Sequence, residues 1–187
     1  MSLTPEKRVW ARLKALEYFD RAHIYLTDSE RENIEVADMG MGRIEEYGIQ
    51  IHNYLNTKRV AAKEMVLFPY QICPEQMHPP FDGTPGKEET FRVRWGTLYL
   101  YTEGEPVEKD KMFAKIPAGK ENTFHVFHEI KLEIGMQYTM EPGITHWIVG
   151  GPEGCVVSEF STHNRDDLDY YSDPEVARMD GVTLHED

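Results

Sequence analysis

Cysteine, basic residues and long apolar runs are all scarce in this sequence of 187 residues. The two cysteines, Cys73 and Cys155, are far apart and not in a CxxC arrangement, so no disulfide framework is predicted and a reducing compartment is expected. No apolar run approaches the roughly 18 residues of a membrane span. The N-terminal stretch MSLTPEKRVWARLKALEYFD carries charges throughout, without the apolar segment of a signal peptide. We therefore expect a cytoplasmic protein with no membrane partner.

Positive charge is also in short supply. Lys and Arg number 20 against 33 Asp and Glu, which gives a net charge of −13, and the basic residues form no cluster that could neutralise phosphates. This balance argues against nucleic acid and anionic membranes as partners, and mildly against heavily phosphorylated substrates. With 40% hydrophobic residues and enough length for one sizeable core, the chain is predicted to be a single globular domain that binds a neutral small molecule.

The main helical signals lie in the N-terminal part of the chain. Thr4 is a suitable cap and Pro5 fits the first helical position. An apolar stripe at helical spacing comes next, made of Val9, Leu13, Leu16 and Phe19. A second short helix is expected to begin at Thr27 or Asp28.

From about residue 45 onward, short segments rich in β-branched and aromatic residues alternate with Gly, Pro and polar turns. Residues 145–151 and 154–162 are two such segments. Many short strands without intervening helices indicate a sandwich or a closed barrel. Two polar loops, residues 79–88 and 104–123, interrupt the strands and are typical of the border of a binding site. We expect a helical segment over residues 1–40, a barrel over 41–172, and a tail over 173–187 with one helical turn.

A possible metal site is formed by polar residues in two of these strand regions. Because residues two apart in a strand share a face, Gln76 and His78 should point inward together, and Cys73, Glu75 and Met77 should point the other way. Glu89 comes after the first polar loop, and His146 opens a strand after a Pro142-Gly143 turn. Such a mixed set of nitrogen and oxygen donors suits Mn, Fe, Co, Ni or Zn with open positions for water or substrate.

These stretches resemble the paired cupin motifs. The first motif is His-x-His, a gap, Glu, six residues and Gly, matched by residues 76–96, and the second is Pro-Gly-x-x-His, matched by residues 142–146. The longer blocks 63–105 and 145–162 resemble the short bacterial D-lyxose isomerases, and the resemblance extends from about residue 25 to 175. It implies a mainly β protein with a single cupin-type barrel (jelly roll) and N-terminal helices. It further implies a homodimer that holds Mn²⁺ or a similar ion and interconverts D-lyxose with D-xylulose and D-mannose with D-fructose.

The resemblance also assigns roles to individual residues. The metal ligands it implies are His78, Glu89 and His146, with Gln76 in the place of the family's first His. A neutral amide oxygen is a harder donor than imidazole, so the site should bind borderline metals less tightly while remaining acceptable to Mn²⁺. A further role falls on Glu159 as the carrier of the carbon-bound proton. Lys63 would donate to the sugar oxygen that becomes negative or help the proton exchange between O1 and O2. Asp166 and Asp169 would bind sugar hydroxyls or complete the proton path.

Two other functions are compatible with the same residues. A sugar-phosphate isomerase would need a phosphate cradle, for which Lys87, Arg92 and Arg94 are the nearby cations besides Lys63. A non-catalytic sugar-binding cupin is favoured by Gln76, because loss of a ligand converts an enzyme into a binder. Two of these features also have more ordinary interpretations. Lys63 is also compatible with a strand-edge lysine that discourages aggregation, which is the commoner use of lysine in strands. The acidic run at residues 166–169 is typical of a solvated surface. Aromatic residues of one strand offer a dimer interface, namely Trp95, Tyr99 and Tyr101.

Overall fold

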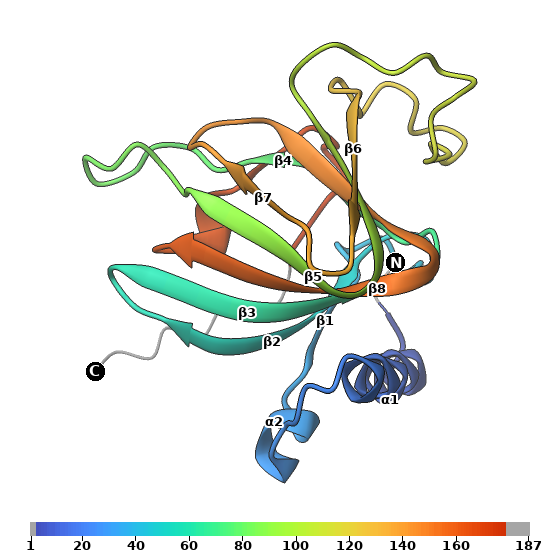
Figure 1. Ribbon diagram of the computed structural model, residues 1–187, viewed down its shortest axis with the longest axis vertical. Helices are drawn as coiled ribbons and strands as arrows, with labels where there is room; N and C mark the ends of the chain where they lie inside the picture. Colours follow the sequence, from blue (N-terminus) through green and yellow to red (C-terminus); the bar gives the residue numbers. More distant parts are fainter. Residues whose placement is uncertain (1–2, 179–187) are drawn as a thin grey trace.

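Nine antiparallel strands curl into one sheet around an apolar interior in the computed structural model, which describes residues 3–178 (Figure 1). The mainly β class predicted from the sequence is confirmed. The helices are α1 (Pro5–Arg21) and α2 (Asp28–Glu32), with a 3-10 turn, η1 (Asp166–Leu168). The strands are β1 (Glu35–Ala37), β2 (Ile49–Asn56), β3 (Val60–Leu67), β4 (Ile72–Met77), β5 (Glu89–Thr102), β6 (His128–Glu133), β7 (Gln137–Met140), β8 (His146–Thr162) and β9 (Tyr170–Tyr171).

The two longest strands, β5 and β8, close the barrel. β8 pairs with β5 along most of its length, while its first part also pairs with β4 and its second part with β3. The prediction of two separate strands over residues 145–162 is wrong, because the glycines between them continue the strand. A Cβ at Gly150 would lie 2.3 Å from the carbonyl oxygen of Phe68, and one at Gly154 would lie 2.5 Å from that of Leu67. Glycine therefore permits close backbone packing here and does not end the strand.

Helix α1 covers the outer face of the sheet near β1, β3 and β8. Thr4 caps it by accepting a hydrogen bond from the Lys7 amide, as the sequence predicts. The predicted apolar stripe is only partly right, because Val9 and Leu13 are 52% and 59% exposed. The buried face instead contains Ala11, Ala15, Leu16, Tyr18 and Phe19. Small alanine side chains let the helix axis lie close to the sheet, so the contact face is rotated toward them.

Strand β4 departs from regular alternation, and this changes which residues face the barrel interior. Its register with β8 shifts between Cys73 and Gln76. As a result Cys73 lies in the barrel core and lines the same cavity as Gln76, so its predicted outward direction is wrong. Such a bulge adds a residue to one strand and reverses the facing of the residues after it. Glu75 does point away from this cavity and binds the backbone of residues 125–126.

The two predicted polar loops are present, and the longer one, residues 103–127, extends beyond the barrel at the end opposite α2 (Figure 1). The expected helical turn at residue 173 is a hydrogen-bonded turn, in which the Val176 amide donates to the Asp173 carbonyl. The rest of the predicted tail, residues 179–187, lies outside the described residues. Over residues 3–178, no helix is long and apolar enough to cross a membrane.

Candidate metal centre

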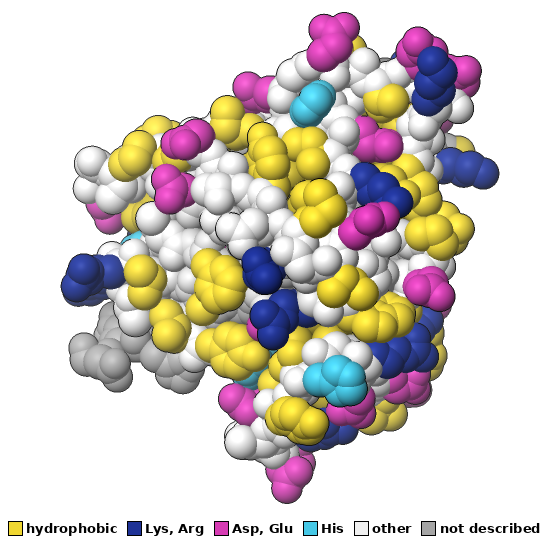
Figure 2. Space-filling model, in the orientation of Figure 1, with side chains coloured by type: hydrophobic (Ala, Val, Ile, Leu, Met, Phe, Trp, Pro, Cys, Tyr) yellow, Lys and Arg dark blue, Asp and Glu magenta, His cyan; other side chains and the backbone are white. Residues whose placement is uncertain are grey.

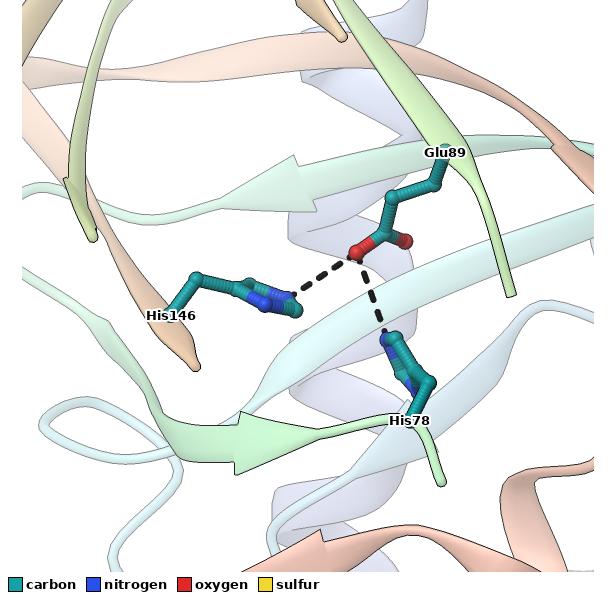
Figure 3. A group of neighbouring side chains, drawn as sticks. All are labelled: His78, Glu89 and His146. Atoms are coloured by element: carbon teal, nitrogen blue, oxygen red, sulfur yellow. Dashed lines mark ion pairs between the residues drawn. The ribbon is translucent and has the colours of Figure 1, made fainter. Parts of the chain in front are cut away.

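Three side chains from separate strand regions converge inside the barrel (Figure 3). His78 comes just after β4, Glu89 opens β5 and His146 opens β8. Glu89 Oε1 lies 3.2 Å from His78 Nε2 and 3.0 Å from His146 Nε2, so one carboxylate oxygen stands between the two rings. All three residues are at most 5% exposed. The sequence motifs thus mark residues that the fold does bring together.

Neighbouring acceptors fix the orientation of both rings. Asp169 Oδ1 lies 2.6 Å from His78 Nδ1, and the Ile144 carbonyl oxygen lies 3.1 Å from His146 Nδ1. With Nδ1 carrying the proton, each ring would present the lone pair of Nε2 to a cation bound at this place. Histidine ligands of metals are usually held by such partners. Asp169, expected to bind substrate, has therefore at least one oxygen engaged with His78.

The donor set fits a divalent cation. The buried atoms His78 Nε2 and Glu89 Oε1 have no hydrogen bond of acceptable geometry among the described residues. Burial raises the pKa of Glu89, but the charges of Lys87, His78 and His146 outweigh burial and hold the pKa well below its usual value. An ionised carboxylate and two imidazole nitrogens, all ligand atoms within 4.8 Å of one another, match the chemistry of a transition-metal site.

Gln76 lies next to this cluster. Its Nε2 is 3.5 Å from His146 Nε2, and its side chain borders the cavity inside the barrel. Rotation of the amide by half a turn would present Oε1 at the same place, since the two ends of an amide have the same shape. The structure therefore puts this residue within reach of the cluster.

Two lysines surround Glu159 in the same cavity. Lys63 and Glu159 face each other across the β3–β8 pair, with Lys63 Nζ 3.5 Å from Glu159 Oε1. Lys87 Nζ is closer, at 2.8 Å from Glu159 Oε1 and 2.7 Å from Glu89 Oε2. Burial lowers the pKa of Lys87, but Glu159 and Glu89 raise it above its usual value, so Lys87 stays charged.

Sequence reasoning misses two cations of this cavity. It indicates Lys87 only as a possible phosphate-binding cation, although a position two residues before Glu89 would place Lys87 on the same face. Arg178 also lines the cavity and lies 2.9 Å from Asp166 Oδ2. A single Arg near the C-terminus carries no local signal that could indicate this contact.

The acidic run at residues 166–169 is divided between the cavity and the surface. Burial raises the pKa of Asp166, but Lys63, Arg178 and Lys87 outweigh it and hold the pKa far below its usual value. Asp167 is exposed and forms an ion pair with Arg165. The solvated interpretation therefore applies to Asp167 and not to Asp166.

Of the cations considered for a phosphate cradle, Lys63 and Lys87 line this cavity, but Arg92 and Arg94 do not. Arg92 and Arg94 alternate with the core residues Phe91 and Val93, so they point away from the barrel interior. Arg92 donates to Gln137 Oε1 on the outer face. On the face shown in Figure 2, Lys and Arg side chains are interspersed with acidic and apolar ones.

No family model matches the chain. It is 53% identical to the D-lyxose ketol-isomerase of Cohnella laeviribosi over 169 residues, which cover 90% of this chain and 92% of that one. It is 50% identical to the D-lyxose/D-mannose isomerase of Thermosediminibacter oceani, over 89% of this chain and 91% of that one. The chain belongs to the D-lyxose isomerase family. The family resemblance inferred from the sequence is thereby confirmed.

Solved structures confirm the fold. The L-ribose isomerase of Cellulomonas parahominis superimposes with a TM-score of 0.73 at 15% identity, over 94% of this chain and 95% of that one. The L-ribose isomerase of Acinetobacter sp. DL28, in complex with L-ribose, gives a TM-score of 0.74 at 14% identity, over 94% of both chains. The predicted cupin-type barrel is confirmed, and at this identity the likeness concerns the fold alone.

Proposed function

We propose that the protein is an aldose–ketose isomerase that interconverts D-lyxose with D-xylulose, and D-mannose with D-fructose. Family membership supports this activity, and the names of the two relatives support both aldoses. The observation that carries the proposal is a buried carboxylate, Glu159, clamped by two ammonium groups beside a cluster suited to a metal ion. Isomerisation needs these groups together, because a carbon-bound proton must move while negative charge develops on oxygen.

The metal ligands in this proposal are His78, Glu89 and His146, with Gln76 as a fourth or adjacent donor. We propose Mn²⁺ or a similar divalent transition ion, since the set combines imidazole with carboxylate and amide oxygen. When bound, the ion would polarise two sugar oxygens and stabilise the charge of the enediolate.

Glu159 would carry the proton between the two carbons. In the aldose-to-ketose direction it takes the proton from C2 and returns it to C1, while a second proton moves from O2 to O1. Lys87 and Lys63 hold its Oε1 in place by ion pairs. Lys63 would also donate a hydrogen bond to the sugar oxygen that becomes negative. Asp166 and the free Oδ2 of Asp169 are left to accept bonds from sugar hydroxyls.

The first test is isomerase activity on D-lyxose and D-mannose after chelation and after return of Mn²⁺, with bound metal measured on the same samples. We expect about one ion per chain and restored turnover. Metal without turnover on either sugar would contradict the proposed reaction. Thermal stabilisation by sugar without product would instead select the sugar-binding cupin. The same assay with phosphorylated sugars should show lower activity than with free sugars, because Arg92 and Arg94 face away from the cavity.

Replacement of Glu159 by Gln tests the proton carrier. The variant should lose turnover by a factor on the order of 10²–10⁴ while retaining its metal, since general base catalysis contributes about that much. Glu153→Gln changes an exposed carboxylate of the same strand and should behave as wild type. A Glu159→Gln enzyme with normal turnover would assign the proton transfer to another group.

We also propose a homodimer that acts in the cytoplasm. The interface suggested by the sequence does not support it, because Tyr101 is fully buried and Trp95 packs against Tyr18 of α1. The exposed apolar side chains of α1, Val9 and Leu13, offer another surface. Sedimentation of wild type and Leu13→Glu would test both the dimer and this surface.

A further inference from the structure

The cavity that contains the candidate catalytic groups is too narrow to hold a sugar. Lys63, His78, Lys87 and Glu159 are each at most 5% exposed. The free space that they enclose is about 20 Å³, which is room for a single water molecule. Sites for small organic ligands usually measure roughly 300–1,000 Å³. If the proposed function holds, part of the wall must move to admit a sugar.

The most weakly attached part of the wall is its C-terminal segment, residues 173–178, here named the C-terminal strap. It comes after β9, which is joined to β4 by only two residue pairs. The strap itself adds no strand. It is held by one backbone bond, from the Ala177 amide to the Met39 carbonyl, and by polar side chains. Lys120 of the long loop contributes ion pairs to Asp173 and Glu175, each 2.7 Å long.

Segments held by few apolar contacts and by polar contacts at their margins open at lower free-energy cost than core strands. Val176 is the strap's partly buried apolar residue against the main core. The rest of the cavity is lined by residues of β2, β3, β4, β5 and β8, by Met39, by the loop between β4 and β5, and by the segment around η1. The strands are paired with their neighbours in the sheet. The loop is anchored in the cavity through Lys87, which forms ion pairs with Glu89 and Glu159. Opening is therefore assigned to the strap and not to the barrel.

Arg178 connects the strap to the cavity. Its guanidinium bridges Glu35 of β1, at 3.0 Å, and Asp166, at 2.9 Å, with a side chain only 12% exposed. The Nε atom is buried and has no hydrogen-bond partner among the described residues. A buried N–H group without an acceptor costs free energy. The cost is larger for a guanidinium, because this group keeps its positive charge even when it is buried. A hydroxyl oxygen in the adjoining cavity would satisfy it.

We propose that the C-terminal strap opens to admit the sugar and closes over it, and that Arg178 binds a sugar hydroxyl in the closed state. Arg178 donates from Nε to the hydroxyl oxygen, and Asp166, paired with the same guanidinium, accepts the hydroxyl proton. Such a donor and acceptor pair recognises a hydroxyl group, not a carbonyl or a phosphate. This inference extends the proposed function, because it names residues that hold the sugar apart from the metal ligands.

Kinetics of three variants test the role of Arg178. Arg178→Met should raise KM for D-lyxose about ten-fold or more with unchanged metal content, since a hydrogen bond from a charged donor is lost. Arg178→Lys should recover part of this loss because it keeps a charged donor. Arg165→Met, which removes a surface cation paired with Asp167, should leave KM within two-fold of wild type. An active Arg178→Met enzyme with wild-type KM would overturn the proposal.

Hydrogen exchange of the wild type tests the strap without any variant. In the metal-loaded protein, an equilibrium mixture of D-lyxose and D-xylulose should slow amide exchange in residues 173–178 at least about five-fold. The exchange rate of β5 should change little. Unchanged exchange in the strap would overturn the proposal even if the sugar is isomerised. Absence of product would contradict the proposed function alone, because sugar-dependent protection of the strap would still be measured. Protection by glycerol equal to that by the sugar would count against hydroxyl recognition in this site.

Discussion

At the scale of single residues, Gln76 is where the chain departs from the pattern His-x-His. Its amide lies 3.5 Å from His146 Nε2, so an imidazole in its place could add a nitrogen donor to the cluster. We predict that Gln76→His raises the affinity for Zn²⁺ and Co²⁺ about ten-fold or more, and the affinity for Mn²⁺ less, because imidazole suits the softer ions. Competition with a chromophoric chelator measures this.

Gln137→His supplies the matched control, since Gln137 is exposed on β7 and its side chain contacts Arg92, which points away from the barrel interior. Its metal affinity should equal that of wild type. If Gln76→His binds Zn²⁺ no more tightly than this control, Gln76 does not occupy a ligand position.

A second residue-scale prediction concerns Glu64, whose carboxylate accepts one hydrogen bond, shared between its two oxygens, from Ser158 Oγ in a buried position. Burial raises the pKa of Glu64, and Ser158 and Arg94 lower it only in part. The folded state therefore binds the proton more tightly, so this contribution to stability is present below the unfolded pKa and is lost as pH rises through the folded pKa. Glu64→Gln should therefore gain stability relative to wild type as the pH rises above about 4, near the pKa of a glutamate in the unfolded chain.

Denaturation in urea at several pH values measures this difference. Ser158→Ala removes the bond that favours the ionised form, so its stability should fall more steeply with pH than that of wild type. Parallel pH profiles for all three proteins would contradict the raised pKa.

Residues also differ in how far the sequence reveals them. His78, Glu89 and His146 can be found because each lies at or next to the start or end of a strand, where spacing determines facing. Lys87 and Arg178 approach the cavity from a loop and from the tail, whose paths depend on tertiary contacts. Cys73 is predicted on the wrong face because a bulge in β4 has no signature in composition.

At the scale of elements, Glu75 attaches two segments to the outside of β4. Its buried carboxylate accepts from the amides of His125 and Val126, at 2.6 and 3.0 Å, and from Ser172 Oγ at 2.6 Å. It thereby holds the end of the long loop and the segment after β9. Glu75→Ala leaves several donors without an acceptor and should lower the free energy of unfolding by about 3 kcal/mol or more.

Urea denaturation measures the stability, and hydrogen exchange of residues 123–127 measures the release of the loop. Glu121→Ala is a suitable comparison, because that exposed carboxylate accepts a single bond from the Gly119 amide and its loss should cost at most about 0.5 kcal/mol. Equal stability of the two variants would show that Glu75 does not hold the loop.

The bounds and buried faces of helices and strands are predicted well where neighbouring residues determine them, and less well where tertiary packing determines them. The start of α2 at Thr27 or Asp28 is predicted correctly, because its capping box is formed by the near neighbours Thr27 and Glu30 alone. The orientation of α1 is not predicted correctly. The helix packs through a face that contains Ala11 and Ala15, and part of the stripe of larger apolar residues stays exposed. The continuity of β8 depends on close approach to neighbouring strands, which sequence cannot show.

At the scale of the whole molecule, the barrel buries a group of charged side chains. Each buried charge would be costly alone, and like charges would repel each other without the opposite charge between them. Glu89 and Glu159 are buried with Lys87 between them, and the two histidines share one carboxylate oxygen. A divalent ion at this place would bind the folded state and not the unfolded chain, whose ligands lie far apart in sequence. Metal binding should therefore stabilise the entire fold.

We predict that Mn²⁺ at about 100 times its dissociation constant adds roughly 2.7 kcal/mol to the free energy of unfolding. For a chain of this length, that corresponds to a rise in Tm of about 5–11 °C. Thermal melts of chelated protein over a series of Mn²⁺ concentrations measure the rise, with Mg²⁺ as the ion that this nitrogen-containing site should bind poorly. Glu89→Gln keeps the shape of the side chain but loses the charged ligand, and its Tm should not respond to Mn²⁺. A wild-type Tm independent of Mn²⁺, or a full rise in Glu89→Gln, would show that the cluster His78, Glu89 and His146 does not hold the ion.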